Sequence, residues 1–249
     1  MAFHFIIIVS DFSGGRRYGW HYSSEERLDK EYIESSLNKV KKKCGNVQFG
    51  IHKLATDSTD WNSVVDKDSF FVDVIVTEDI DDFIGVVSND QELTAYDLTK
   101  FILTVRPVSH LKLQKLIYYI YAEFLIRTGE KLFKEPIVAY KYGPVVEDVF
   151  EKYRVHGSSK IDYVEDAKFS INADKNAFTP SLMKILSSEY GMVVVECVVT
   201  VLEKYIKTDP FVLVDKTHRQ GGPWSRVYVE GMNRCITDDL ITQYHHVTE

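Results

Sequence analysis

The sequence predicts an α+β protein, with a small α/β domain over residues 1–90 and a mainly helical domain with a short β-hairpin over residues 91–249. Three observations lead to this prediction. Residues 1–90 alternate β-branched and aromatic runs with amphipathic stretches, as strands and helices do in a layered domain. From Leu93 onward, apolar residues recur mainly at helical spacing. The polar run at residues 88–91 separates the two patterns.

Three runs in the N-terminal domain are typical of buried strands: residues 3–9, 47–54 and 70–77. Two stretches predict helices: residues 28–44 and 80–87. Gly45 supplies the stop for the first helix, and the run Thr77-Glu78-Asp79 falls at the cap of the second. Trp61 is expected in a polar loop between two of the strands.

The strongest helical pattern in the chain runs from Ser109, which should cap the helix, to Gly129, which should end it. Further helices are expected at residues 94–105, 144–153, 180–190 and 192–206, with short ones beginning near Pro210, Pro223 and Thr237. Residues 136–143 predict a short extended piece, and weak alternation over residues 157–179 predicts a hairpin. His245 and His246 are expected to lie in a frayed tail.

Composition narrows the classes of function. The chain carries 37 acidic and 30 basic residues, a net charge of −7, and residues 1–90 account for −6 of it. An acidic surface repels phosphate, so nucleic acid is not expected as a direct partner. The apolar runs are too short or too interrupted to cross a membrane, and no signal-peptide pattern is present. Three widely separated cysteines, Cys44, Cys197 and Cys235, fit reduced thiols in the cytoplasm.

Three segments combine polar or aromatic side chains with conformationally fixed turns: LKLQKLIYY at residues 111–119, EPIVAYKYGPVV at residues 135–146 and THRQGGPW at residues 217–224. Each has a plain structural explanation. The first is an amphipathic core helix, the second is a strand-to-helix turn in which Pro144 favours an extended Gly143, and the third begins a helix at Pro223. The alternative is that they share a recognition surface, because tyrosine and tryptophan are enriched at protein interfaces.

Together and in this order, the three segments resemble the SocA-like antitoxin domain, also called the Panacea domain, over residues 93–247. Members of that family carry a LKLQKLLYY-type helix, an EPIxAWxxGPV turn and a late THxxxPW segment. This chain departs from the pattern in having Tyr140 where the family usually has tryptophan, and in the Gly-Gly run before Pro223. The resemblance implies a mostly helical fold that binds and neutralises a toxin. The N-terminal domain carries no comparable resemblance.

We therefore expect a non-enzymatic protein-binding module without cofactor or metal, most simply an antitoxin that neutralises a toxin by direct binding. The N-terminal domain would add specificity. The candidate protein-contacting residues come from the three segments: Lys112, Gln114, Lys115, Tyr118, Tyr119, Tyr140, Tyr142, Gly143, Pro144, His218, Pro223 and Trp224. Asp215 lies one turn before His218, but no complete catalytic set accompanies the pair.

Two alternatives remain open at this stage. The chain could be a phage or mobile-element protein that binds and inhibits a host defence protein. It could instead be an enzyme with a nucleotide-handling N-terminal domain, suggested by the Gly14-Gly15-Arg16-Arg17 loop and by the acidic residues around Asp79. The loop lacks phosphate-loop spacing, and acidic residues at a helix N-terminus are stabilised by the helix dipole alone.

Overall fold

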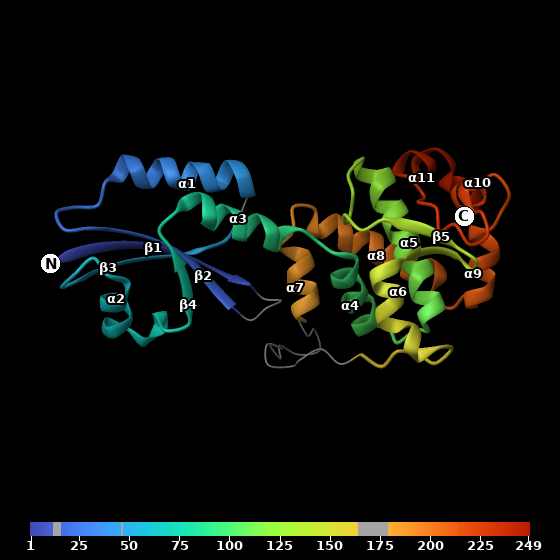
Figure 1. Ribbon diagram of the computed structural model, residues 1–249, viewed down its shortest axis with the longest axis horizontal. Coiled ribbons are helices and arrows are strands. Elements are labelled where there is room, and N and C mark those ends of the chain that lie inside the picture. Colours follow the sequence, from blue (N-terminus) through green and yellow to red (C-terminus); the bar gives the residue numbers. More distant parts are fainter. Residues whose placement is uncertain (12–15, 46, 164–178) are drawn as a thin grey trace. The chain divides into compact units, whose positions relative to one another are not determined.

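A computed structural model of the protein describes residues 1–11, 16–45, 47–163 and 179–249. The chain divides into two compact units, Met1–Glu92 and Leu93–Glu249. The first unit contains the four-stranded sheet, and the second unit is mainly helical. The predicted α+β class is therefore confirmed (Figure 1). Among the described residues, no helix combines the length and the apolar character needed to span a membrane.

The first unit is built on a four-stranded sheet in the order β3-β1-β2-β4. Its strands are β1 (Ala2–Asp11), β2 (Arg16–Ser24), β3 (Gly50–Thr56) and β4 (Val74–Thr77). The central strand β1 pairs antiparallel with both β2 and β3, whereas β2 pairs parallel with β4. The sheet is therefore mixed, with β3 and β4 at its edges.

Helices cover both faces of this sheet. Because side chains alternate along a strand, Phe5 and Ile7 of β1 pack on one face against α1 (Lys30–Cys44) and α3 (Ile80–Gln91). Ile6 and Ile8 pack on the other face against α2 (Trp61–Lys67) and the 3-10 turn η1 (Ser69–Phe71). Figure 1 shows α1 on one side of the sheet and α2 on the other. Burial on both faces explains why the β1 sequence is a continuous apolar run.

Three local predictions in this unit were wrong or incomplete. Strand β2 was missed because its sequence, RRYGWHYSS, has too few apolar residues to stand out. Strand β2 is stabilised by its pairing with β1 on one side and with β4 on the other, and its Trp20 is fully buried. Trp61 begins α2 instead of lying in a loop, because the Asp60 carboxylate caps that helix. The predicted strand at residues 70–77 is only β4, since η1 occupies its beginning.

The second unit surrounds helix α5 (His110–Thr128), which Ser109 caps and a left-handed Gly129 ends, as predicted. The other helices are α4 (Ala95–Val105), α6 (Glu147–Tyr153), α7 (Pro180–Leu186), α8 (Gly191–Tyr205), α9 (Pro210–Thr217), α10 (Pro223–Val227) and α11 (Asp238–Tyr244), with 3-10 turns η2 (Arg154–His156) and η4 (His245–Thr248). Helices α4, α6, α8, α9 and α11 all contact α5. Fourteen of the nineteen residues of α5 are buried, so it is a core helix on almost every side.

The β-hairpin of the second unit lies earlier in the chain than predicted. It consists of β5 (Ile137–Tyr140) and β6 (Gly143–Val146), so residues 144–146 are extended and helix α6 begins only at Glu147. Of the hairpin predicted at residues 157–179, residues 164–178 lie outside the described chain. Residues 157–163 form no strand, and Lys160 makes only an isolated bridge to Ser109.

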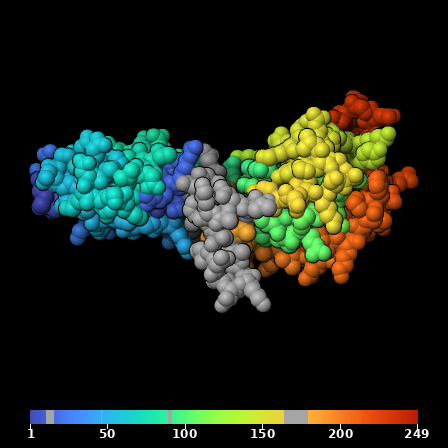
Figure 2. Space-filling view, turned by 90° about the horizontal axis from the view of Figure 1, so that it is seen from below, coloured from blue at the N-terminus to red at the C-terminus, as the bar shows by residue number. Residues whose placement is uncertain are grey.

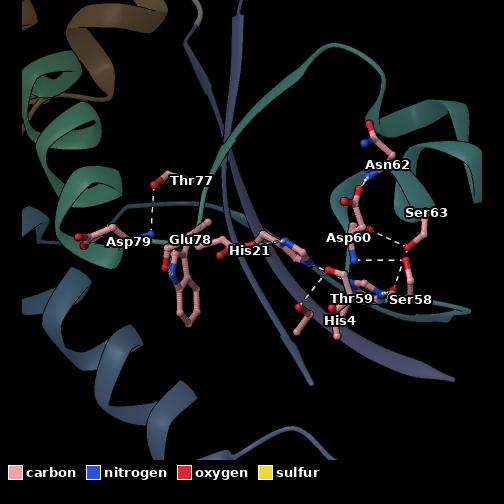
Figure 3. A network of polar contacts seen from close by, with 12 residues as sticks. His4, His21, Ser58, Thr59, Asp60, Asn62, Ser63, Thr77, Glu78 and Asp79 are labelled. Carbon is pink, nitrogen blue, oxygen red and sulfur yellow. Dashed lines mark hydrogen bonds and ion pairs between the residues drawn. The ribbon is translucent and has the colours of Figure 1, made fainter. Parts of the chain in front are cut away.

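A buried histidine pair joins β1 to β2 in the first unit. His4 Nδ1 lies 2.8 Å from His21 Nε2, and His4 Nε2 lies 3.1 Å from the Ser58 carbonyl oxygen. Figure 3 shows the two rings pointing toward one another, with Ser58 beside His4. Because a carbonyl only accepts, His4 carries its proton on Nε2 and its Nδ1 accepts from His21. His21 Nδ1 is then left without a hydrogen-bond partner among the described residues.

We predict that this pair makes the first unit sensitive to acid. Burial, followed by the nearby charge of His4, lowers the pKa of His21 from 6.5 to about 4, and burial also lowers the pKa of His4. Because both histidines stay neutral in the folded state, their stabilisation is present above pH 6.5 and is lost as the pH falls toward 4. The loss from His21 is up to about 3 kcal/mol.

Hydrogen exchange of the β1 and β2 amides between pH 7 and pH 4 measures this loss. His21→Gln keeps a donor toward His4 but cannot titrate, and it should flatten the pH dependence. An unchanged pH profile in this variant would contradict the prediction.

Candidate protein-binding site

The three motif segments meet at one junction in the second unit. Lys115 of α5 donates from Nζ to the Pro144 carbonyl oxygen at 2.9 Å. A Cβ at position 143 would lie 2.7 Å from Lys115 Nζ and 2.8 Å from Thr217 Oγ1 of α9. Gly143 also has a φ of +102°, which side chains rarely adopt. Only glycine therefore fits between the first and third segments.

Lys115 is fully buried at the centre of the junction. Removal from water disfavours its charged form and lowers the pKa of the amine to about 7. A lysine with such a pKa loses its proton far more easily than a surface lysine. Because a neutral amine has fewer N–H donors to satisfy than an ammonium group, one backbone acceptor is enough to fix the position of this side chain. Its contact with Pro144 fixes the start of β6 against α5.

Gln114, one residue before Lys115, also binds the hairpin. Its side-chain oxygen accepts from the Val146 amide at 2.9 Å, and its side-chain nitrogen donates to the Val146 carbonyl at 3.4 Å. The Gln114 side chain thus makes the two hydrogen bonds to Val146 that the backbone of a neighbouring strand would otherwise make. Since Gln114 satisfies both backbone groups of Val146 in the interior, β6 needs no further strand there.

Trp224 ties the third segment to the hairpin turn. Its Nε1 donates to the Tyr140 carbonyl at 2.8 Å, and its ring stacks between His218, at 3.6 Å, and Tyr228, at 4.3 Å between ring centroids. Pro223 is buried at the first position of α10 and sets the direction of that helix. Burial lowers the pKa of His218, and the nearby Lys115 lowers it further. A neutral imidazole suits this aromatic stack.

The remaining candidates on α5 hold other parts of the same unit. Lys112 Nζ donates to the carbonyls of Ile206 and Thr208, at 2.6 and 2.7 Å, and so caps the end of α8. The Tyr119 hydroxyl donates to the Thr248 carbonyl at 3.1 Å, and the Tyr118 hydroxyl lies 3.3 Å from His245 Nδ1.

The expectation of a frayed tail at His245 and His246 was therefore wrong. His245 and Thr248 are buried in η4, and burial lowers the pKa of His245 to about 4. Arg219, part of the third segment but not among the predicted contacts, donates to the Val247 and Glu249 carbonyls at 3.2 and 2.7 Å. The acceptors of Arg219 lie 28 and 30 residues further along the chain, and no local sequence pattern indicates them.

The junction exposes one small surface, which we call the turn surface: Tyr140, Lys141, Tyr142 and Glu147. Tyr142 is 53% exposed, and Lys141 beside it is exposed as well. The half-buried Tyr140 donates its hydroxyl to a Glu147 carboxylate oxygen at 2.8 Å, which joins the turn to α6. Helix α6, yellow in Figure 2, lies at the surface of the helical unit. Most of the other predicted contact residues are buried, and their geometry supports the turn.

The features that suggested an enzyme have structural partners. Arg17 pairs with Asp73 and donates to the Phe70 carbonyl, and this pairing lowers the pKa of the Asp73 carboxyl. Asp79 caps α3, and Asp81 pairs with Lys39. Among the described residues, no three histidine, cysteine or acidic side chains come together as metal ligands would. Residues 12–15 of the predicted loop lie outside the described chain.

We predict that Gly143→Ala destabilises the second unit by about 2 kcal/mol or more, because it combines an unfavourable φ with overlap onto Lys115 and Thr217. Urea denaturation followed through Trp224 fluorescence measures this loss. Gly129→Ala is the control, because position 129 shares a positive φ but has open space around it, so its cost should be about 1 kcal/mol. Equal losses at the two positions would show that the junction is not tightly packed.

Removal of residues 245–249 should also destabilise the second unit, because it exposes Tyr118 and Tyr119 and leaves Arg219 without its two carbonyl acceptors. We expect a loss of several kcal/mol in the free energy of unfolding. Thermal denaturation with hydrogen exchange of α5 provides the measurement. A tail that merely lies on the surface would be removed with almost no change.

The part of the chain that forms the junction is similar in sequence to known proteins. Residues 113–225 match the family model described as antitoxin SocA-like, Panacea domain. A curated protein named antitoxin SocA, from Caulobacter vibrioides, is 31% identical over 119 residues, which are 47% of this chain and 58% of that relative. No solved structure gives a significant match. The resemblance inferred from the three segments is confirmed: residues 113–225, within the second unit, are similar to the antitoxin SocA-like, Panacea domain family.

Proposed function

We propose that the protein is an antitoxin that neutralises a protein toxin by binding it, without catalysis. The observation that carries the proposal is the junction at which all three segments typical of the Panacea domain converge on one hairpin turn. Similarity to a protein named antitoxin SocA supports the class of function. Binding would take place in the cytoplasm, where the free cysteines Cys44, Cys197 and Cys235 remain reduced.

The turn surface is the contact that we assign to the Panacea domain. Tyr142 presents a large ring with few rotatable bonds, and this makes tyrosine effective at protein interfaces. Trp224 and Tyr140 hold the backbone below it through the 2.8 Å hydrogen bond. A turn fixed in this way loses little conformational entropy when a partner binds. The other Panacea residues act by positioning this turn.

The first unit would supply the specificity for one toxin. Its Asp and Glu residues outnumber its Lys and Arg residues, and most of the net charge of −7 lies there. Such a surface speeds the approach of a partner that is basic overall. Two binding surfaces on one chain would also raise the overall affinity through their effective concentration.

Co-expression tests the proposed function. Each gene adjacent to this one is expressed alone and together with this chain, and growth and co-purification are measured. We expect one neighbour to arrest growth alone and to be tolerated and co-purified when this chain is present. Toxicity that this chain leaves unaltered in every case would overturn the proposal.

Within such a complex, Tyr142→Ala should weaken binding about tenfold or more without changing the free energy of unfolding. Phe211→Ala is the matched control, since Phe211 of α9 is also a large exposed aromatic residue but lies outside the turn surface. Isothermal titration calorimetry and urea denaturation separate affinity from stability. Full affinity in Tyr142→Ala would remove the turn surface from the proposal.

A further inference from the structure

The outer edge of strand β3 in the first unit carries unpaired backbone groups. The strand lies at the end of the sheet and pairs only with β1 among the described elements. Lys67 Nζ donates to the Ala55 carbonyl at 2.6 Å, so the backbone groups of Ala55 point away from β1. Alternation along an antiparallel strand then directs the amide and carbonyl groups of Lys53 and Ile51 outward as well.

A groove of about 440 Å³ flanks this edge. It is lined by residues 51–54 of β3, together with Lys67, Asp68 and Phe71 from the end of α2 and from η1. Ile51 is 52% exposed, whereas Phe71 is buried and forms an apolar wall. An added strand would place its alternate side chains over the two faces of β3, above Ile51 on one side and beside Phe71 on the other.

The groove has a charge opposite to that of the unit around it. Neither Lys53 nor Lys67 forms an ion pair with a carboxylate in the described part of the chain, although residues 1–90 carry a net charge of −6. Asp68 is the acidic residue of the lining, and its carboxylate is already used to accept from the Phe70 amide at 2.9 Å. Lys53 lies on the Phe5 face of the sheet, with its Nζ 5.5 Å from the centre of that ring, whereas Lys67 comes from the opposite face and donates to Ala55. Carboxylates on the Lys53 face of an added strand would complement Lys53.

We propose that β3 accepts an extended acidic segment of the partner protein as an additional strand of the sheet. The segment would alternate carboxylate and apolar side chains and pair with Ile51 and Lys53 through its backbone. Its carboxylates would lie on the face of Lys53 and its apolar side chains beside Phe71. The proposal rests on the proposed function only in taking the occupant from the neutralised toxin. Strand addition gives the first unit a physical means of recognising one partner.

The test uses the full chain and a synthetic peptide as long as β3, in which valine and glutamate alternate. A peptide of the same length with lysine in place of glutamate is the charge control. Amide hydrogen exchange and chemical shifts are recorded by NMR during titration. We expect slowed exchange at Ile51 and Lys53 and little change at His52 and Leu54, because the amides of those two residues already face β1.

Two variants separate the backbone contribution from the charge contribution. Ile51→Pro removes an outward amide that the sheet does not use, and it should abolish the alternating protection, whereas Ile51→Ala should keep it. Lys53→Glu should weaken binding of the glutamate peptide several-fold and should improve binding of the lysine peptide. Circular dichroism checks that each variant is folded.

Absence of binding by the glutamate peptide, equal binding of both peptides, or protection away from β3 would overturn the proposal. This experiment contains no toxin, so its failure would leave the antitoxin proposal intact. Conversely, β3 pairing with the peptide would stand even if no neighbouring gene proved toxic.

Discussion

The burial of Lys115 is the constraint on which the second unit of this protein depends. An amine without contact to water needs an acceptor close by, and the Pro144 carbonyl at 2.9 Å provides it. That single contact fixes the beginning of β6 on α5. Once β6 is fixed, Gly143 must pass between Lys115 and Thr217, and no larger residue can take its place. The chemistry of one buried side chain therefore determines the path of a hairpin.

The consequence is that a region rich in tyrosine and lysine serves mostly as scaffold. Gln114 and Tyr119 contact the backbone of other elements, Tyr118 contacts the His245 ring, and none of the three reaches the surface. The exposed side chains of the junction are those of the turn surface, above all Tyr142, and these are the ones that we propose for recognition. Polar residues in a core specify one arrangement because each donor and acceptor has a single partner position. The turn is rigid for this reason, and a rigid turn binds at a lower entropic cost.

Much of the fold could be predicted from the sequence because its elements have strong local signals. Ser109 and Gly129 delimit α5 through caps that act within a few residues, and Pro210 begins α9 for the same reason. Strand β2 lacked such a signal, since it forms by pairing with β1 and β4. Similarly, residues 144–146 are extended because they pair with β5 and because Gln114, thirty-two positions before Val146, binds the Val146 backbone.

The three segments were predicted to lie together, but which of their side chains reach the surface was not predicted. The three segments could be recognised together by their order and spacing, and they do meet in space. Which side chains face outward depends on the packing of distant elements such as η4, whose His245 covers Tyr118 and Tyr119. Helical periodicity could not show this, because α5 is buried on nearly every side. Exposure within a buried helix is therefore decided by tertiary contacts that no local pattern encodes.

Hydrogen exchange of this chain, with and without the toxin proposed as its partner, measures whether the turn surface is the contact. We expect slowed exchange in the β5–β6 turn at Tyr140, Lys141 and Tyr142, with α5 unchanged because it is protected in both states. Protection elsewhere on the second unit, with the turn exchanging as fast in the complex as in the free chain, would contradict this contact.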